Sequence, residues 1–384
     1  MLLLRILETA AVVGAICGSC YYLLCVLSAW RFLRHSRQLH TAASKFAPAI
    51  SILKPLRGTD PDIYEAFRSH CLQDYPEYEI IFGVSDPKDP AIDLVKRLQD
   101  EFPARRIELV YCQKVLGANM KVSNLVQMLS SARYDVLLVN DSDIKVPPDY
   151  LRRVASQLSD PKVGMVTCLY RGIAGNTLGS KLESLGISTD FGAGVLAARQ
   201  LEGIRFGLGS TLAFTRSALE KIGGFEPMVD YLADDYELGA RIAEAGLQVL
   251  LSDVVVDHHL PDYSMRGFID HQLRWNRSTR HSRRWGYTGM VLTFGLPWAL
   301  LALMLSWGAS WAWGLLALAS ALRLAVAVFV GGRVIHDSRL KRTLWLLPLR
   351  DLAAMALWVG SYTGRRVAWR GDWFVLENGK LRPA

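Results

Sequence analysis

The chain has 384 residues, enough for about two or three domains, and 51% of them are hydrophobic. Its mean hydropathy of +0.17 is high for a soluble protein. The formal net charge is +8, and the basic residues cluster beside apolar segments, which favours anionic lipid headgroups over nucleic acid as the charged partner. The six cysteines show no pattern of a disulfide framework or a zinc site, as expected in a reducing compartment.

The first apolar segment, residues 9–30, carries no charge over 22 positions and is long enough to cross a bilayer. Basic residues follow this segment, Arg31 and Arg34 among them, so we interpret it as an uncleaved anchor rather than a signal peptide. The positive-inside rule then places the next segment in the cytoplasm. We expect residues 1–47 to form the anchor and a basic linker of an integral membrane protein.

Residues 48–263 alternate between strand and helix patterns. Short apolar runs predict strands and amphipathic segments predict helices, at residues 50–53, 60–73, 78–84, 91–102, 107–111, 119–129 and 136–139. Pro55 is expected to end the first strand, because proline cannot donate to a ladder. Repeated strand–helix units predict an α/β fold with a mostly parallel sheet. Right-handed crossovers would place the ends of these strands at one edge.

The clearest site pattern lies just past the fourth predicted strand. Four Val or Leu residues are followed by Asn140-Asp141-Ser142-Asp143, so two carboxylates separated by one residue follow the end of the strand. Ligands of open α/β sheets bind beyond the carboxyl ends of the strands. Oxygen ligands at this spacing can hold a Mg²⁺ or Mn²⁺ that bridges the phosphates of a nucleotide. The same residues also suit an ordinary turn.

Four more polar residues near the same predicted edge are candidates for nucleotide binding: Lys54, Asp86, Lys121 and Asn124. Asp86 follows the second strand, where a carboxylate can accept hydrogen bonds from a nucleobase or ribose, although its surroundings also suit a turn. Lys121 and Asn124 are three apart on a predicted helix and share one face. Lys121 would neutralise a phosphate, or else belong to an exposed, solvated face.

Asp234 and Asp235 begin a predicted helix within residues 231–251. Two adjacent carboxylates make a plausible general base, because their proximity raises one pKa towards working pH. Acidic residues in a first turn are also favoured by the helix dipole, so capping is the alternative. Gly207 and Gly209 precede an apolar strand and allow either close approach to a ligand or a bulge.

Residues 264–285 hold six arginines, several aromatic residues and one acid, Asp270. This composition is typical of an amphipathic helix in the headgroup layer. Arginine can also bind a pyrophosphate, and tryptophan offers an apolar face to a sugar or lipid. The alternative is a simple membrane anchor.

Residues 286–384 form the expected C-terminal membrane region. The uncharged run of residues 285–322 predicts one span near 286–306 and the start of another near 310–331. Residues 343–362 are apolar but interrupted by polar residues, and basic residues flank them on both sides. We therefore expect a re-entrant or interfacial hairpin there, since a full span would place the C-terminus outside.

The order of these motifs resembles a known family. The blocks ILKPLRGTDP, QDYPEYEI, DPAIDLV, KVSNL, NDSDI and ADDYEL precede Arg274-Trp275. This series is similar to the ceramide glucosyltransferase family, family 21 and family 2-type glycosyltransferases, including bacterial relatives that act on hopanoids. The resemblance covers residues 48–285 and the flanking membrane layout. It implies a nucleotide-sugar-binding domain of the GT-A type.

The resemblance also implies roles for individual residues. Asp86 and Asp141 would contact the uridine diphosphate of the donor, and Asp143 would bind the metal, Mg²⁺ or Mn²⁺, beside Asp141. Asp235, next to Asp234, would be the general base. The pair Arg274-Trp275 would close the site around the diphosphate and the acceptor.

Some positions stay open. The family's last motif usually begins with Gln or Arg three residues before the Arg-Trp pair, and here His271 holds that position, with Gln displaced to Gln272. The roles of these two residues are therefore undetermined. His258 and His259 either add a metal ligand or are structural.

The implied reaction moves glucose or N-acetylglucosamine from a UDP-sugar donor to the hydroxyl of a membrane lipid acceptor, ceramide or a hopanoid, with inversion. A processive polysaccharide synthase is one alternative, although it needs more spans to form a channel. A non-catalytic membrane protein that binds a nucleotide sugar is the other. It is disfavoured because every acidic position that transfer needs is present.

Overall fold

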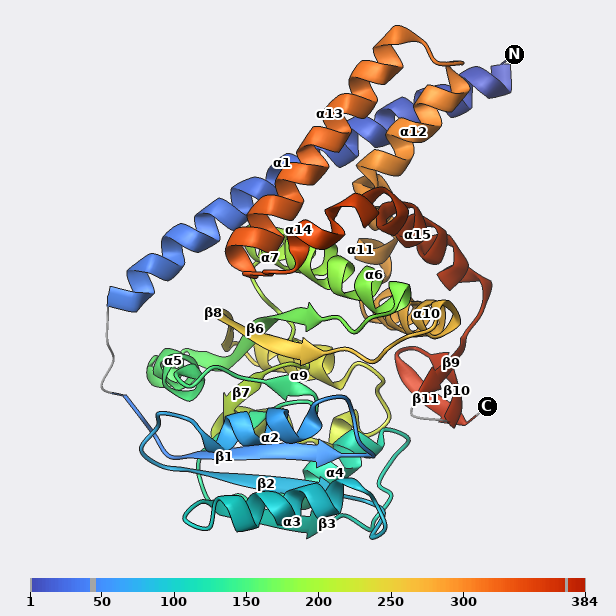
Figure 1. The fold of residues 1–384 in the computed structure, drawn as a ribbon. Helices are drawn as coiled ribbons and strands as arrows, with labels where there is room; N and C mark the ends of the chain where they lie inside the picture. Colours follow the sequence, from blue (N-terminus) through green and yellow to red (C-terminus); the bar gives the residue numbers. More distant parts are fainter. Residues whose placement is uncertain (1, 42–45, 370–371, 384) are drawn as a thin grey trace. The chain divides into compact units, whose positions relative to one another are not determined.

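The computed structural model describes residues 2–41, 46–369 and 372–383. The chain forms two compact units, which we call the membrane-helix unit and the sheet unit (Figure 1). The membrane-helix unit comprises residues 1–38, 176–202 and 262–373, and the sheet unit comprises residues 39–175, 203–261 and 374–384. Part of the expected basic linker, residues 42–45, lies outside the described residues.

The sheet unit is built on a mixed, mostly parallel sheet of eight strands in the order β3-β2-β1-β4-β7-β6-β8-β5. Strands β1 to β4 run parallel, and β7 is antiparallel to both of its neighbours. Strands β6 and β8 are parallel, and β5 is antiparallel to β8. The strands are β1 (Ile50–Leu56), β2 (Tyr78–Val84), β3 (Arg106–Tyr111), β4 (Val136–Val139), β5 (Ile144–Lys145), β6 (Val163–Ile173), β7 (Leu212–Thr215) and β8 (Gln248–His259). The predicted α/β class with a mostly parallel sheet is confirmed.

Helices connect these strands and present their apolar stripes to the sheet, as the 3.6-residue periodicity predicts. Those of the sheet unit are α2 (Ile63–Cys71), α3 (Ala91–Glu101), α4 (Met120–Met128), α5 (Tyr150–Ser156), α8 (Arg216–Lys221) and α9 (Asp234–Glu244). The N-terminus of α4 is fixed by Asn119, whose side chain accepts a hydrogen bond from the Val122 N–H at 3.2 Å. Short 3₁₀ turns cover Gln157–Ser159 and Glu226–Met228.

The expectation that Pro55 ends the first strand is wrong, because β1 continues to Leu56 and Pro55 pairs with Gly83 of β2. Leu53 directs its carbonyl towards β4, where it accepts from the Asn140 N–H. Pro55 lies two residues further and faces the same side, beyond the end of the β4 pairing. Its missing N–H therefore breaks no ladder hydrogen bond.

The end of the chain also belongs to the sheet unit. Strands β10 (Asp372–Glu377) and β11 (Lys380–Pro383) pair antiparallel across a tight turn at Asn378 and Gly379, both of which have positive φ. From residue 374 onwards this hairpin lies in the sheet unit, although the sequence indicates only a C-terminal membrane region there.

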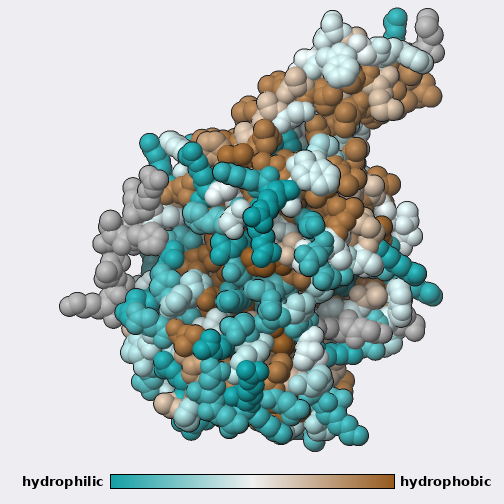
Figure 2. All heavy atoms as spheres, in the orientation of Figure 1, coloured by the Kyte–Doolittle hydropathy of each residue, from teal (hydrophilic) through white to brown (hydrophobic). Residues whose placement is uncertain are grey.

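The membrane-helix unit contains long apolar helices, and Figure 2 shows hydrophobic side chains gathered over the part that holds α1, α12 and α13. Its elements are α1 (Leu2–Thr41), α6 (Leu178–Gly186), a π-helical turn η2 (Ile187–Phe191), α7 (Gly192–Glu202), α10 (Met265–Ser282), α11 (Arg284–Gly289), η4 (Met290–Thr293), α12 (Gly295–Leu305), α13 (Ser310–Val326), η5 (Ala327–Val334), α14 (Leu340–Thr343), η6 (Leu344–Leu346), α15 (Leu347–Gly360), η7 (Ser361–Thr363) and β9 (Arg366–Trp369). The helix predicted over residues 264–285 corresponds to α10 and the start of α11.

Three helices are long and apolar enough to cross a membrane among the described residues: Leu2–Ser36, Ser310–Val334 and Leu340–Thr363. A fourth candidate is bent by 51° between Arg284–Thr293 and Gly295–Leu305, so the span expected near residues 286–306 is not straight. The hairpin expected over residues 343–362 is wrong, because the segment is one helical run of 24 residues.

The interruptions that suggested a hairpin have structural explanations. Pro348 lies in the first turn of α15, where proline does not break a helix. Asp351 is buried, and Arg323 of α13 donates to it at 2.9 Å. Charged groups in an apolar helix pair with one another in this way, so the polar residues do not exclude a span.

Candidate active site

The loop after β4 carries Asp141 and Asp143 at the centre of the sheet. It is anchored by Asn140, which is fully buried and donates through Nδ2 to the Ser210 carbonyl at 2.6 Å. The Asn140 side chain also contacts His70 Nε2 at 3.1 Å and donates to the Tyr150 hydroxyl at 3.0 Å. These contacts hold the loop to α2, to α5 and to the segment just before β7, so the following carboxylates are presented from a rigid base.

Lys54 supports this loop from inside the protein. Its side chain is fully buried on β1, and Nζ donates to the Asp141 main-chain carbonyl at 3.0 Å. Burial lowers the pKa of Lys54 to about 7, against the opposing effect of the Asp143 and Asp141 carboxylates. In the structure Lys54 therefore positions the Asp141 loop, whereas the sequence suggested direct contact with a donor nucleotide.

Lys121 joins two carboxylates that are far apart in the chain. Its Nζ lies 2.8 Å from Asp141 Oδ1 and 3.0 Å from Asp234 Oδ2. Burial alone would lower the pKa of Lys121, but the two carboxylates outweigh it and raise the pKa above its ordinary value. The ammonium group thus stays charged and links the end of β4 to the start of α9.

Asp235 lies in the first turn of α9 with both carboxylate oxygens oriented by main-chain donors. Oδ2 accepts from the Gly209 N–H at 2.8 Å, and Oδ1 accepts from the Tyr236 N–H at 2.8 Å. Burial and the neighbouring charge of Asp234 raise the pKa of Asp235 to about 6. A carboxylate with this pKa, next to a site for a reacting group, is suited to accept a proton near neutral pH.

Glycines bring these parts together. A Cβ at Gly209 would lie 2.8 Å from Asp141 Oδ2 and 3.3 Å from Asp235 Oδ2, so both carboxylates border this glycine. A Cβ at Gly239 of α9 would lie 2.3 Å from the Gly207 main-chain nitrogen. Helix α9 therefore packs directly on the backbone that binds Asp235. The sequence showed these glycines only as a weak signal.

Asp143 and His258 form the second part of the site. Antiparallel pairing of β5 with β8 places Ile144 opposite His258, and His258 Nε2 lies 3.0 Å from Asp143 Oδ2. His259 faces elsewhere, with Nδ1 2.9 Å from Asp62 Oδ2. Of the two histidines that the sequence left open, the structure brings His258 to the candidate metal ligand.

The donor set fits a divalent cation. No group of three or more His, Cys, Asp or Glu side chains with metal-binding geometry occurs in the described part of the chain. Mg²⁺ is, however, commonly held by one or two carboxylates together with substrate phosphates and water. Asp141 and Asp143 provide carboxylates with side-chain exposures of 41% and 16%. Oxygen and imidazole ligands also suit Mn²⁺.

Asp86 and Asn124 lie at the end of β2. Asp86 is exposed, and its Oδ1 accepts from the Lys88 N–H at 2.8 Å. Asn124 is buried, and its Oδ1 accepts from the Ser85 hydroxyl at 2.7 Å. Asn124 therefore fixes the residue before Asp86, while Lys121 on the same helix reaches Asp141. Because Asp86 is exposed, its side chain is accessible to a ligand.

The predicted residues of α10 belong to the membrane-helix unit. Gln272 Nε2 donates to both carboxylate oxygens of Glu183, at 3.0 and 2.9 Å, and His271 Nδ1 lies 3.3 Å from Glu183 Oε1. Burial would raise the pKa of Glu183, but His271, Arg350 and these hydrogen bonds hold it below its usual range. The ring of Trp275 lies 5.0 Å from that of His271, and Arg274 lies beside it in the chain. Glu183 has no recognisable sequence signal.

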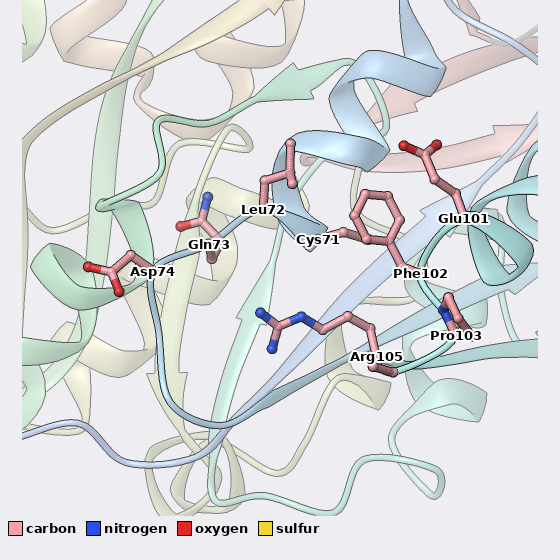
Figure 3. A pocket seen from close by; sticks show the side chains of 9 residues that line it. Cys71, Leu72, Gln73, Asp74, Glu101, Phe102, Pro103 and Arg105 are labelled. Carbon is pink, nitrogen blue, oxygen red and sulfur yellow. The ribbon is translucent and has the colours of Figure 1, made fainter.

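A pocket of the sheet unit lies at the edge of the sheet opposite to the candidate site, and Figure 3 shows the side chains that line it. It is lined by the last turns of α2 and α3 and by the residues just before β3, including Cys71, Glu101 and Arg105. The parallel strands β1 to β3 begin at this edge, whereas the carboxylates follow their ends. The pocket is therefore separate from the candidate site.

Comparison with known proteins shows which family and fold the chain resembles. The profile of glycosyl transferase family 21 matches residues 10–382. Ceramide glucosyltransferase 3 of Caenorhabditis elegans is 27% identical over 269 residues, which are 69% of this chain and 58% of that protein. Ceramide glucosyltransferase 1 of the same organism is 26% identical over 229 residues, 59% of this chain and 49% of that protein. The matched region thus spans about half of these curated relatives.

A solved structure shares the fold. The mannosyltransferase PcManGT from Pyrobaculum calidifontis, in complex with GDP-Man and Mn²⁺, superposes with a TM-score of 0.53 at 20% identity. The similarity covers 92% of this chain and 99% of that one. The expected GT-A type of fold, with apolar helices towards both ends of the chain, is confirmed.

Proposed function

The chain belongs to glycosyl transferase family 21, and from this premise we propose that it moves one sugar, glucose or N-acetylglucosamine, from a UDP-sugar to the hydroxyl of a membrane lipid. The observation that carries the proposal is Asp235, whose carboxylate borders the same glycine as Asp141 and has a pKa raised to about 6. The names of the curated relatives support ceramide as the acceptor class. A hopanoid is the other acceptor that we propose.

In the proposed mechanism the sheet unit binds the donor at the ends of its parallel strands. Asp86 accepts hydrogen bonds from the nucleoside, and Asp141, held by Lys121 and Lys54, lies beside the diphosphate. Asp143 and Asp141 would hold Mg²⁺ or Mn²⁺, which neutralises charge on the diphosphate when it is bound. The Mn²⁺ complex of the structural neighbour supports this ion class.

The sugar transfer itself is assigned to Asp235. Its carboxylate takes the proton of the lipid hydroxyl, and the hydroxyl oxygen forms a bond to C1 of the sugar from the face opposite the diphosphate. The bond from C1 to the diphosphate oxygen breaks in the same displacement, and UDP leaves with the electron pair. One displacement inverts the configuration at C1. Arg274 and Trp275 would close on the diphosphate and the acceptor.

The membrane helices keep the enzyme beside its acceptor. The arginines of α10 suit the anionic lipid headgroups at the cytoplasmic surface, which supports our proposal of a cytoplasmic sheet unit. The lipid then keeps its chains in the leaflet while its hydroxyl enters the site, and the UDP-sugar arrives from water. We place the protein in the bacterial inner membrane.

The direct test is product formation. Detergent-solubilised protein would be incubated with Mn²⁺ or Mg²⁺, each of the two UDP-sugars, and ceramide or a hopanoid polyol, and the lipids analysed by mass spectrometry. One added hexose or N-acetylhexosamine supports the proposal. A ladder of added sugars would indicate a processive polysaccharide synthase, and donor binding without turnover would indicate a non-catalytic binding protein.

The rate should depend on pH through Asp235. Its pKa is raised to about 6, and only the ionised carboxylate accepts a proton, so transfer falls as the pH is lowered through about 6 and levels off above it. Initial rates between pH 5 and 8 at saturating donor measure this profile. A rate independent of pH over this range would contradict the assignment of Asp235 as the base.

The metal concentration that transfer requires should change when His258 is substituted, and should not change when His259 is substituted. Chelation with EDTA is expected to stop transfer, and added Mn²⁺ or Mg²⁺ to restore it. His258→Ala removes the hydrogen-bond partner of Asp143 and should raise the Mn²⁺ concentration needed for half-maximal rate by about 10–100-fold. His259→Ala, which loses only the contact with Asp62, is the matched control. Equal effects of the two substitutions would place the metal elsewhere.

A further inference from the structure

The loop that leads into the catalytic carboxylates is held from two sides. It comprises residues 229–233, between the 3₁₀ turn Glu226–Met228 and α9, and ends directly before Asp234 and Asp235. Such a loop has no regular secondary structure of its own to fix it. The direction in which it enters α9 therefore depends on what its main chain contacts.

One side of the loop is bound by the segment before α4. The Asn119 N–H donates to the Val229 carbonyl at 2.7 Å, and the Asn119 side chain donates to the Tyr231 carbonyl at 2.7 Å. The Ala118 N–H donates to Asp230 Oδ1 at 3.0 Å. Asn119 also caps the helix that carries Lys121, so this side of the loop is linked to the charge bridge of the site.

The other side is bound by the C-terminal hairpin, β10 and β11. The Leu381 N–H donates to the Asp230 carbonyl at 2.7 Å, and the Leu232 N–H donates to the Gly379 carbonyl at 3.1 Å. Tyr231 and Lys380 are thus paired as in an antiparallel ladder. The loop therefore acts as an additional edge strand of the hairpin. The paired loop residues cannot shift along the hairpin without breaking both hydrogen bonds.

Side chains reinforce this pairing. The Lys380 ammonium lies 5.3 Å from the centre of the Tyr231 ring, and the Arg241 guanidinium of α9 lies 5.5 Å from it. A Cβ at Gly379 would lie 3.4 Å from the Tyr231 ring, so the turn of the hairpin packs against the same side chain. Tyr231 therefore connects the hairpin, the loop and α9.

We propose that the C-terminal hairpin is a positioning element for the catalytic carboxylates: by pairing with residues 230–232, it sets the geometry in which Asp235 meets the acceptor hydroxyl. This inference rests on the proposed function. Lys380 and Leu381 are positioning residues that act through the loop, since within the described part of the chain neither forms a hydrogen bond or ion pair with Asp234 or Asp235. Donor binding depends instead on the strand ends and Lys121, on the other side of the loop.

The experiment compares three variants of the 384-residue chain. The first ends at Glu377 and so removes both hydrogen bonds of the hairpin to the loop. Lys380→Gln removes the cation on Tyr231, and Arg382→Gln removes an exposed cation from the same strand as the matched control. Transfer rates are measured against donor and acceptor concentration, together with the affinity for UDP with Mn²⁺ and the thermal unfolding temperature of each variant.

We expect the truncation to lower kcat by about tenfold, the effect of losing one to two net hydrogen bonds, with the donor KM and UDP affinity within about twofold of the wild type. Lys380→Gln should lower kcat by about threefold, and Arg382→Gln should leave it unchanged. An unchanged kcat in the truncated protein would overturn the proposal. A parallel fall of kcat, UDP affinity and unfolding temperature in both the truncation and Lys380→Gln would also overturn it, because it would show a purely structural hairpin.

Amide hydrogen exchange separates this inference from the proposed function. If the wild type transfers no sugar to any acceptor, the proposed function fails while the role of the hairpin is still decided. Faster exchange confined to residues 229–235 in the truncated protein supports positioning of the loop. Unchanged exchange there contradicts it.

Discussion

Asp235→Asn is expected to abolish measurable sugar transfer, lowering kcat by about 10²–10⁴-fold, while donor binding and stability remain close to those of the wild type. The amide has nearly the same shape as the carboxylate, and its oxygen can still accept from the Gly209 or the Tyr236 N–H. It cannot take a proton from a hydroxyl. The loss should therefore appear in kcat and not in the donor KM, since the carboxylate acts on the acceptor.

The matched control for this change is Glu244→Gln, which removes the same charge from the exposed end of the same helix. Glycolipid formation is followed by mass spectrometry, and UDP affinity and thermal unfolding are measured alongside. Glu244→Gln should behave as the wild type. If Asp235→Asn retains more than about a tenth of the wild-type rate, the loss of rate is smaller than the removal of a general base should cause. Asp235 would then not be the base, and Asp234 would become the candidate.

Lys121→Met is expected to weaken donor binding and to destabilise the sheet unit. The substitution leaves Asp141 and Asp234 without the ammonium group that lies 2.8 and 3.0 Å from them. Removing one partner of a buried ion pair costs about 3–5 kcal/mol, and because Asp141 is 41% exposed we expect the lower end of this range. For a unit of this size, about 3 kcal/mol corresponds to roughly 6–12 °C in unfolding temperature.

Thermal unfolding in detergent and UDP affinity test this prediction together. Lys114→Met is the control, because Lys114 is an exposed lysine in the segment before the same helix. It should change neither quantity. An unfolding temperature and UDP affinity equal to those of the wild type in Lys121→Met would show that the two carboxylates do not depend on the bridge.

Much of the fold follows from local pattern. Strands β2 and β4 were predicted with the bounds that the structure shows, because short runs rich in Val, Ile, Leu and aromatic residues favour a strand. The helices α3 and α4 agree within about one residue at each end. The exceptions have clear causes. Pro55 does not end β1, because it faces a side of β1 that no longer has a partner strand. Residues 340–363 form one helix, because the buried carboxylate of Asp351 is paired with Arg323.

The candidate site was predictable as a set of residue types and not as a set of contacts. The two carboxylates after β4 and the pair at the start of α9 are local motifs, and the order of the sheet brings Asp141 and Asp234 to the same lysine. The partner of Gln272 was not predictable, since Glu183 lies in a segment without any motif. The support that Lys54 gives to the Asp141 loop was also hidden, because its position at a strand end does not show which main-chain group its ammonium meets.

The sequence by itself determined the class of the fold, the apolar segments, the acidic positions and the family, because composition, periodicity and ordered motifs are properties of short stretches of chain. Only the tertiary structure decided which of those positions meet. The partnership of Asp143 with His258 depends on the register between β5 and β8, and the attachment of the catalytic loop depends on a hairpin at the far end of the chain. Contacts of this kind are set by how distant strands and loops pack together, and no short stretch of sequence records them.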